Sequence, residues 1–209
     1  MPKLIVNAQV SLDGVMQGPG GPEEDPRDNF TLGGWAMPFG DEAIGQALHD
    51  TATADHDLLF GRRTYDIFAG YWPKQGDNPV TNGFNRATKY VITHRPEGLD
   101  WPTSKAIGGD FVQAVRELKA SAGRELQMWG SHEVLQQLIG AGLIDEYRLW
   151  IAPVVLGQGR RLFETGAPAR SLELVKSSVS SKGVMLNTYR PAGAVEVTTQ
   201  RAKEVGSKR

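Results

Sequence analysis

The stretch LLFGRRTYDIF, Leu58 to Phe68, joins a short apolar run to what looks like the first turns of a helix. A glycine, two arginines and a threonine lie between the two, at positions 61 to 64. Glycine lets a ligand approach the backbone closely, arginine offers forked donors, and threonine is suited to cap a helix. In an open α/β sheet, ligands bind where strands end and helices begin, because free amide hydrogens and partial positive charge meet there. The stretch therefore predicts an α/β fold with an anion site at this strand end.

Two further junctions of the same kind carry polar groups. Thr93, His94 and Arg95 follow a short strand-like run, and Gly130 and Ser131 open the longest apolar helix. Taken singly, a double arginine is usually a solvated surface feature, and a Gly-Ser pair is a common helix cap. Three such junctions in one chain favour a single ligand with more than one phosphate group.

The order of the apolar segments extends this interpretation to the whole chain. Strand-like runs and helical stripes alternate over the first two thirds, and three strand-like runs then follow one another over residues 145–155, 171–181 and 183–190. This order predicts one α/β domain over residues 1–191, with a mainly parallel central sheet flanked by helices and antiparallel edge strands at the C-terminal end. Residues 192–209 are polar, and we expect a flexible tail there.

Composition excludes several classes of site. The 209 residues carry a formal net charge of -1, which argues against a nucleic-acid binder, because such proteins usually present a basic face. The chain has no cysteine, and its four histidines form no pair with metal-ligand spacing, so we expect no metal site. The first residues resemble neither a secretory signal nor a membrane span, which predicts a cytoplasmic protein. The glycine- and proline-rich segment 17–29 is expected to be a long functional loop, with a disordered insertion as the alternative.

An ordered set of short motifs carries a family resemblance. They are SLDG at 11–14, GRRTYD at 61–66, THR at 93–95, WGS at 129–131 and GLIDEYRLWIAPVVLGQGRRLF at 142–163. With these motifs the chain resembles the dihydrofolate reductase-like superfamily, and within it the branch related to the C-terminal reductase domain of bifunctional riboflavin-biosynthesis enzymes. The sequence differs from that branch at residues 128–131, which are Met-Trp-Gly-Ser here and tend to be Glu-Gly-Gly-Ser in such reductases. A carboxylate near the substrate is therefore missing.

The resemblance implies NADPH as the cofactor. In the family, the two arginine-bearing junctions hold the adenosine end and its 2'-phosphate, and the glycine-rich helix start lies against the pyrophosphate. A 2'-phosphate dianion needs paired cations, whereas NADH offers only a hydroxyl group there. By position, the cofactor-binding residues are Gly61, Arg62, Arg63, Thr64, Thr93, His94, Arg95, Gly130, Ser131 and His132.

The resemblance implies fewer details about the catalytic and substrate-binding residues. In dihydrofolate reductase, a carboxylate in the helix after the mobile loop holds and helps to protonate the pterin, and GGWAMPFGDE resembles that region. Asp41 is the first candidate for the catalytic acid, and Asp13 is a second. Trp35 and Glu42 are candidates for substrate binding. Asp41 and Glu42 are also well placed merely to complement a helix N-terminus, and Asp13 to form an Asp-Gly turn.

These features predict an NADPH-dependent reductase that passes hydride to a small heterocycle of the pterin or pyrimidine type. A nucleotide-binding module without turnover is the alternative. A purely structural protein, whose arginines pair with its own carboxylates such as Asp66 or Glu164, is a second alternative. The resemblance also favours a homodimer, with the face of Tyr147, Leu149 and Ile151 as the candidate interface.

Overall fold

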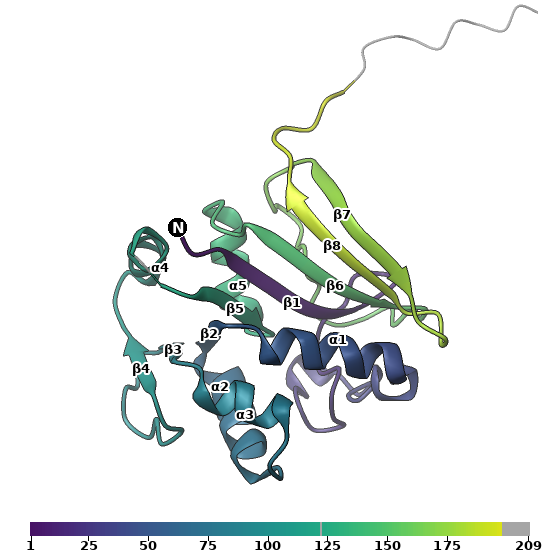
Figure 1. Ribbon diagram of the computed structural model, residues 1–209. Coiled ribbons are helices and arrows are strands. Elements are labelled where there is room, and N and C mark those ends of the chain that lie inside the picture. Colours follow the sequence, from purple (N-terminus) through teal and green to yellow (C-terminus); the bar gives the residue numbers. More distant parts are fainter. Residues whose placement is uncertain (122, 198–209) are drawn as a thin grey trace, which may run out of the picture.

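The computed structural model describes residues 1–121 and 123–197, and it is built around one eight-stranded sheet. The strand order is β4-β3-β2-β5-β1-β6-β8-β7 (Figure 1). The first six strands along the chain pair in parallel, and the last two pair antiparallel at one edge. The predicted α/β sheet is therefore confirmed. The strands are β1 (Leu4–Ser11), β2 (His56–Gly61), β3 (Lys89–Ile92), β4 (Ser104–Ile107), β5 (Glu125–Trp129), β6 (Glu146–Ala152), β7 (Leu172–Val179) and β8 (Met185–Pro191).

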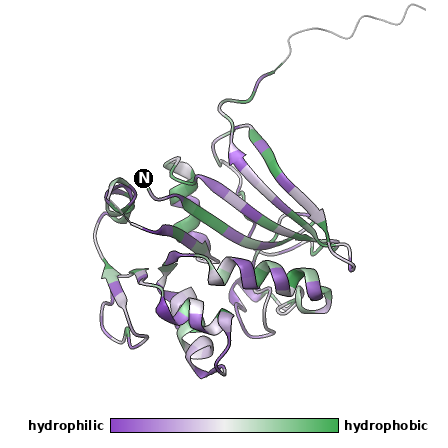
Figure 2. Ribbon diagram, viewed as in Figure 1, coloured by the Kyte–Doolittle hydropathy of each residue, from purple (hydrophilic) through white to green (hydrophobic). Residues whose placement is uncertain are grey.

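Helices cover both faces of the sheet. They are α1 (Glu42–Thr53), α2 (Arg62–Tyr71), α3 (Pro79–Arg86), α4 (Phe111–Ala120) and α5 (His132–Gly140). Side chains of α4 and α5 pack into one apolar cluster against the sheet, whereas side chains of α1, α2 and α3 pack into a second cluster. Figure 2 shows hydrophobic residues along the central strands, and both hydrophobic and hydrophilic residues on the covering helices.

Strand β1 is covered on both faces, as its continuous apolar sequence predicts. Leu4 and Val6 belong to the cluster with α4 and α5, and Ile5 and Asn7 alternate with them and are also buried. The strand pairs with β5 on one side and β6 on the other, with Leu4 opposite Leu126. This central place fixes where β1 ends relative to its neighbours.

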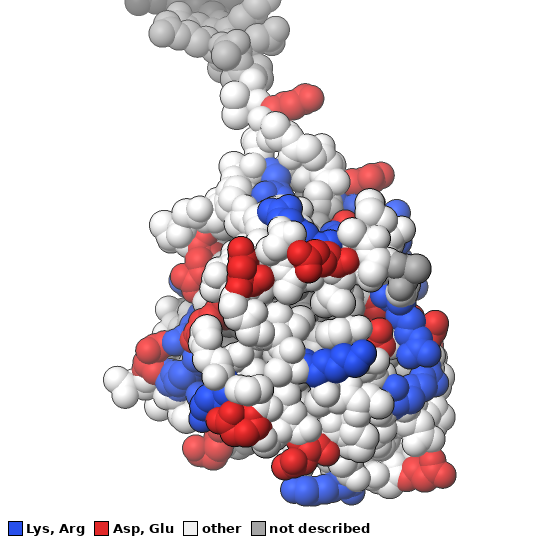
Figure 3. Space-filling view, turned by 90° about the vertical axis from the view of Figure 1, so that its left-hand side faces the viewer, with Lys and Arg blue, Asp and Glu red and all other residues white. Residues whose placement is uncertain are grey.

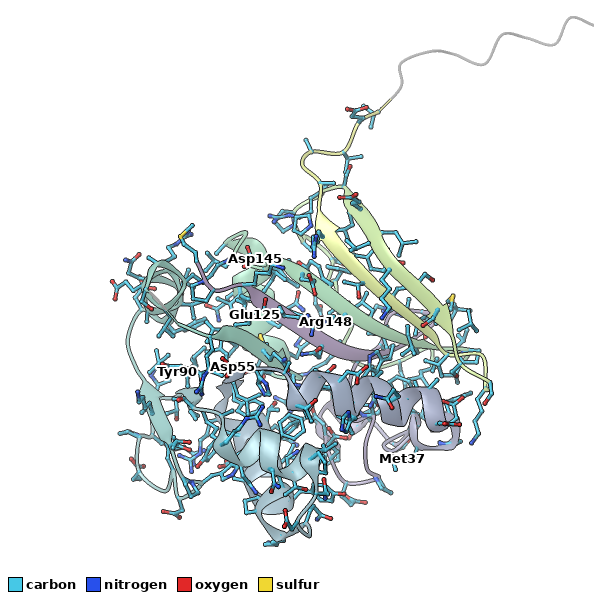
Figure 4. All side chains as sticks on the ribbon, in the orientation of Figure 1. Met37, Asp55, Tyr90, Glu125, Asp145 and Arg148 are labelled. Carbon is cyan, nitrogen blue, oxygen red and sulfur yellow. The ribbon has the colours of Figure 1, made fainter. Side chains whose placement is uncertain are left out.

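The amino ends of the parallel strands lie at the edge of the sheet away from the predicted site. Asp55, Glu125 and Asp145 mark these ends and are labelled in Figure 4. The Asp145 carboxylate accepts a hydrogen bond from the Leu4 amide at 2.7 Å and lies 2.5 Å from the Lys119 ammonium. The carboxyl ends of the strands consequently all open at the opposite edge.

The helix at 111–120 begins where its sequence predicts. Asp110 is the N-cap, and its carboxylate accepts a hydrogen bond from the Gln113 amide at 3.0 Å. Sequence patterns did not indicate α3 or β4. Helix α3 contains Gly83, and a Cβ atom added at this position would lie only 1.9 Å from the Ala52 carbonyl oxygen. Close packing of α3 on α1 therefore requires a residue that weakens helix propensity.

The prediction that Tyr147, Leu149 and Ile151 form an interfacial face is wrong for the first two residues, because their side chains are buried. Tyr147 is 1% exposed and Leu149 is 6% exposed, and both pack in the cluster with α4 and α5. The opposite face of β6 is covered too, because Trp150 is buried in the cluster with α1, α2 and α3. The outer strand β7 is instead exposed along most of its length, including Leu174, Val175 and Val179.

The surface carries both signs of charge. Figure 3 shows lysine and arginine interspersed with aspartate and glutamate over the face that includes the β4 edge. Over residues 1–121 and 123–197, no helix combines the length and the apolar character needed to cross a bilayer. The expected tail falls partly outside the described residues, at 198–209.

Candidate functional site

The sheet order brings the three predicted junctions to neighbouring strand ends, since β2 lies between β3 and β5. Two hydrogen bonds join the β2 and β5 junctions directly. The Gly61 amide donates to Ser131 Oγ at 2.9 Å, and the Ser131 amide donates to Thr64 Oγ1 at 2.9 Å. Thr64 and Ser131 therefore connect two strand ends, and the capping bonds expected from them are absent from both helix starts. Helix α2 begins at Arg62 with Gly61 as its N-cap.

The backbone at these junctions leaves little room for side chains. A Cβ atom on Gly61 would lie 3.2 Å from Val134 Cγ2, and one on Gly130 would lie 3.2 Å from Thr64 Oγ1. Gly130 has a φ of 53°, and Ser131 follows it with φ 53° and ψ 44°, which is uncommon for a residue other than glycine. The two hydrogen bonds hold Ser131 in this conformation.

Arg62 organises the loop after β3. Its Nη1 donates to the carbonyl oxygens of Arg95 at 2.8 Å and Glu97 at 2.7 Å, and its Nη2 donates to that of Gly98 at 3.3 Å. Its Nε lies 2.8 Å from the Asp66 carboxylate, which is the internal pairing that the structural alternative expects. The Arg62 guanidinium thus fixes the neighbouring loop through its own donors.

Arg63 and Arg95 point their charge toward the surface. Arg63 is 44% exposed at its side chain and lies 3.1 Å from the Asp25 carboxylate. The Arg95 side chain is exposed and has no hydrogen-bond or ion-pair partner within the described parts of the chain. Its amide donates to Thr93 Oγ1 at 2.9 Å, which shapes the turn after β3. Two cations therefore flank the joined strand ends.

A hollow of about 160 Å³ opens beside these strand ends. It lies between the ends of β3 and β4 and the first two turns of α5. Ligand sites for whole small molecules usually enclose about 300–1,000 Å³, so this hollow fits one end of a larger ligand. Its lining residues are Ile92, Thr93, His94, Ile107, Gly108, Gly109, Phe111, Glu133, Val134 and Gln137.

His132 faces away from that hollow toward the segment after β6. Its Nε2 lies 3.0 Å from the Glu164 carboxylate and 3.1 Å from the Arg161 carbonyl oxygen. Its Nδ1 is buried and has no hydrogen-bond partner among the described residues. The imidazole therefore links α5 to the 161–164 segment.

Asp13 is held by hydrogen-bond donors that favour its ionised form. Ser11 Oγ donates to it at 2.6 Å, and the amides of Leu156 and Gly157 donate at 3.1 and 2.9 Å. These bonds, the Ser11 hydroxyl foremost, lower the pKa of Asp13 to about 2. A carboxyl group of this kind has no proton to give near neutral pH, and its geometry makes it an anchor for the loop after β6.

Asp41 has a comparable role at the start of α1. Its carboxylate accepts from the Ile44 amide at 3.1 Å as the N-cap and from Ser181 Oγ at 2.7 Å. The Ser181 hydroxyl is the main cause that lowers the pKa of Asp41 to about 2. Glu42 follows in the first turn and is exposed. The helix-terminus explanation that the sequence left open therefore fits both residues.

Trp35 fastens the segment after β1. It is 9% exposed, packs in a small cluster with Val15 and Phe30, and donates from Nε1 to the Gln17 carbonyl oxygen at 2.8 Å. The loop at 17–29, expected to be functional, packs over the strand ends. Its Asp25 reaches Arg63.

Sequence patterns did not single out Arg27, Glu133 and Arg160. The Glu133 carboxylate lies 2.7 Å from Arg27 Nη1 and 2.9 Å from Arg160 Nη1. The three residues come from the loop, from α5 and from the segment after β6, far apart in sequence. The GRR at 159–161 was part of a family motif, and it was the one sequence signal for Arg160.

The match to a known family covers almost the whole described chain. The model of the RibD C-terminal domain matches residues 2–186, which include β1, every helix and the joined strand ends. The chain belongs to the RibD C-terminal domain family. One relative of this RibD C-terminal domain chain is the uncharacterized protein YyaP from Bacillus subtilis (strain 168). It is 28% identical over 191 residues, which cover 90% of this chain and 94% of YyaP.

Solved structures show the fold of this RibD C-terminal domain. A pyrimidine reductase-like protein from Corynebacterium diphtheriae superposes with a TM-score of 0.64 at 15% identity, covering 91% of this chain and 92% of its own. Dihydrofolate reductase from Enterococcus faecalis, complexed with NADP(H), superposes with a TM-score of 0.56 at 16% identity, covering 90% and 96%. The fold is therefore dihydrofolate reductase-like, as the sequence motifs predicted.

Proposed function

We propose that the protein is an NADPH-dependent reductase that transfers hydride to a small heterocycle of the pyrimidine or pterin type. The observation that carries the proposal is the joining of the β2 and β5 junctions through Gly61, Thr64 and Ser131, beside a hollow at the ends of β3 and β4. Family membership and the reductases among the structural neighbours support the same reaction class.

The residues present fit a nicotinamide dinucleotide. Gly61 and Gly130 let the β2 and β5 junctions pack closely together, because a Cβ atom at either position would lie 3.2 Å from a neighbouring side chain, and the hollow beside them can take one end of such a ligand. In this proposal Thr93 and His94, which line the hollow, border the adenine. Arg63 and Arg95 bind the 2'-phosphate, because both side chains are exposed and follow the ends of the adjacent strands β2 and β3. Arg62 contributes by holding the 95–98 carbonyl groups in place.

NADPH, when bound, supplies a hydride, and the reduced heterocycle must also gain a proton. Asp13 and Asp41 are ionised near neutral pH, since hydrogen-bond donors lower the pKa of each to about 2. We therefore assign them to positioning the loop after β6 and helix α1, and we assign the proton to solvent. Orientation of the reactants is then the main contribution of the protein.

A second candidate function is binding of NADPH without turnover. The observation that favours it is the same pair of ionised aspartates, because a reductase with a protein-borne acid would need one of them protonated. Turnover with any heterocycle eliminates this candidate.

The experiment is a titration of the purified protein with NADPH and NADH, followed through tryptophan fluorescence, and then a screen for NADPH oxidation with pyrimidine and pterin substrates. We expect NADPH to bind at least about tenfold more tightly than NADH, because charge-assisted bonds to the 2'-phosphate are lost with NADH. Arg63→Gln and Arg95→Gln should remove most of that difference. Equal binding of both nucleotides by the wild type would contradict the proposed 2'-phosphate site, and failure to bind either would refute the cofactor altogether.

A further inference from the structure

Two arginines converge on one carboxylate at the start of α5. Arg27 Nη1 lies 2.7 Å from Glu133 Oε1, and Arg160 Nη1 lies 2.9 Å from the same oxygen atom. Each arginine has a second partner on its other side, since Arg27 pairs with Asp25 at 2.7 Å and Arg160 pairs with Asp28 at 3.0 Å. The two guanidinium groups are therefore aimed inward at a common point.

The common point is a solvent-exposed carboxylate. The Glu133 side chain is 69% exposed, whereas Arg27 and Arg160 are only 32% and 22% exposed at theirs. Ion pairs in contact with solvent contribute little to stability, so separating Glu133 from the arginines costs little. The hydrogen bond to Glu133 foremost raises the pKa of Arg160, while the nearby Arg27 charge acts in the opposite direction, because the two guanidinium groups repel one another. An anion with more charge than a carboxylate would satisfy this pair of cations better.

Residues of this Arg27–Glu133–Arg160 cluster border two hollows. Glu133 borders the hollow of about 160 Å³ at the ends of β3 and β4. Arg160 and Asp28 border a second hollow of about 220 Å³, which also involves Gln17 and Gly159. A ligand that spans the two hollows would pass Glu133 and Arg160, and Arg27 lies against the same Glu133 carboxylate.

We propose that Arg27 and Arg160 bind the diphosphate of the dinucleotide, and that Glu133 occupies their donors until the diphosphate displaces it. This inference rests on the proposed function, because it assigns a further part of the same cofactor. Guanidinium groups match phosphate oxygens with two donors each, and a diphosphate offers two charges where Glu133 offers one. Asp25 and Asp28 keep the arginines oriented during the exchange. The 17–29 loop thereby becomes part of the cofactor site through Arg27.

The test measures NADPH affinity in Arg27→Gln, Arg160→Gln and Glu133→Gln. The matched control is Arg124→Gln, which removes another surface arginine, paired with Asp55 at the amino edge of the sheet. We expect each of the first two changes to weaken NADPH binding by about tenfold or more, the usual effect of losing a charge-assisted hydrogen bond. Glu133→Gln should tighten binding, because it releases both arginines, and Arg124→Gln should leave it unchanged.

A fragment without a diphosphate gives the second measurement. Adenosine 2'-monophosphate should bind the wild type, Arg27→Gln and Arg160→Gln equally. Arg27→Lys and Arg160→Lys should give intermediate NADPH affinities, and circular dichroism at each stage shows whether a variant is folded. Wild-type affinity for NADPH in both arginine variants, or weaker binding in Glu133→Gln, would overturn the inference while leaving the proposed function intact. Absence of NADPH binding in the wild type would instead refute the proposed function.

Discussion

At the scale of single residues, the donors around a carboxylate decide what it can do. Asp13 and Asp41 have the sequence positions of an acid, but each also accepts hydrogen bonds from groups far along the chain, amides for Asp13 and a hydroxyl for Asp41. Those donors lie up to 144 residues away in sequence, as Gly157 does from Asp13. Sequence alone therefore identified the aspartates as special without showing whether they supply protons or hold loops.

Replacing Asp13 by asparagine should destabilise the protein by about 1–3 kcal/mol at pH 7, because the Leu156 and Gly157 amides lose a charged acceptor. The folded-state pKa, about 2, lies below the ordinary value of 3.8. The stabilisation by Asp13 is thus fully present above pH 4 and is lost as the pH falls toward 2. Urea denaturation of both proteins at several pH values measures this, and a gap that stayed constant down to pH 2 would contradict it.

Lys89 predicts a pH dependence of the same sign at alkaline pH. Its side chain is buried, with Nζ 2.7 Å from the Asn85 carbonyl oxygen and 4.2 Å from the Trp101 ring centre. Burial lowers the pKa of Lys89 to about 8, below the ordinary 10.5. The unfolded chain therefore binds more protons between pH 8 and 10.5, and stability should rise with pH in that window.

The comparison that isolates Lys89 is with Lys89→Met, which removes the titrating group but keeps an unbranched apolar chain. The difference in unfolding free energy between wild type and Lys89→Met should move in favour of the wild type from pH 8 to pH 10. A difference that does not vary over this range would show that Lys89 does not titrate there.

At the scale of elements, local sequence patterns predicted the pieces whose stability is local. The alternation of strand and helix and the capping box of Asp110 needed no knowledge of distant contacts. Helix α3 escaped prediction because Gly83 and the asparagines around it are poor helix formers, and contact with α1 compensates for them. The Asn78-Pro79 pair, an N-cap followed by proline, was the available signal for this helix. Strand β4 has only four residues, all partly or fully exposed, and so lacks an apolar signature.

The candidate site likewise contains some residues that the sequence could predict and others that it could not. Its glycines, arginines and hydroxyl groups follow strand ends and could be found from sequence. The Glu133 pairing with Arg27 and Arg160 could not be found, because three separate segments meet only in the fold. The internal use of Arg62 as a loop anchor was hidden for the same reason, since its acceptors are backbone carbonyl groups.

The link between the β2 and β5 junctions should behave as one unit. Ser131→Ala leaves the Gly61 amide without its acceptor, and Thr64→Val does the same to the Ser131 amide. Each change should cost about 1–3 kcal/mol of stability. The double variant should lose less than the sum, because both bonds hold the same pair of strand ends. Thermal unfolding of the four proteins measures the coupling, and strict additivity would show two independent bonds.

At the scale of the whole molecule, the exposed apolar residues of β7 make that strand the best candidate for contact with a second copy. Leu174, Val175 and Val179 are 52%, 43% and 66% exposed. An uncovered edge strand with apolar side chains tends to associate. We propose that the homodimer implied by the family forms through β7.

Val179→Lys should therefore shift the protein toward monomer in sedimentation velocity runs across a concentration series. The unfolding temperature of the isolated chain should change little, because the position is exposed. Met37, labelled in Figure 4 and 65% exposed, provides the matched control, and Met37→Lys should leave association unchanged. A wild type that is monomeric at every concentration would rule out the dimer.

The central position of β1 in the sheet also affects how the chain folds during its synthesis. Its partners β5 and β6 begin at Glu125 and Glu146, so β1 leaves the ribosome more than a hundred residues before either partner and cannot pair until they follow. At roughly 5–20 residues per second, that interval lasts on the order of 10 seconds. Leu4, Ile5 and Val6 stay uncovered meanwhile, and sheets built from such distant pairings fold slowly. Slower translation before residue 152 should thus lengthen the time in which nascent chains need chaperone protection.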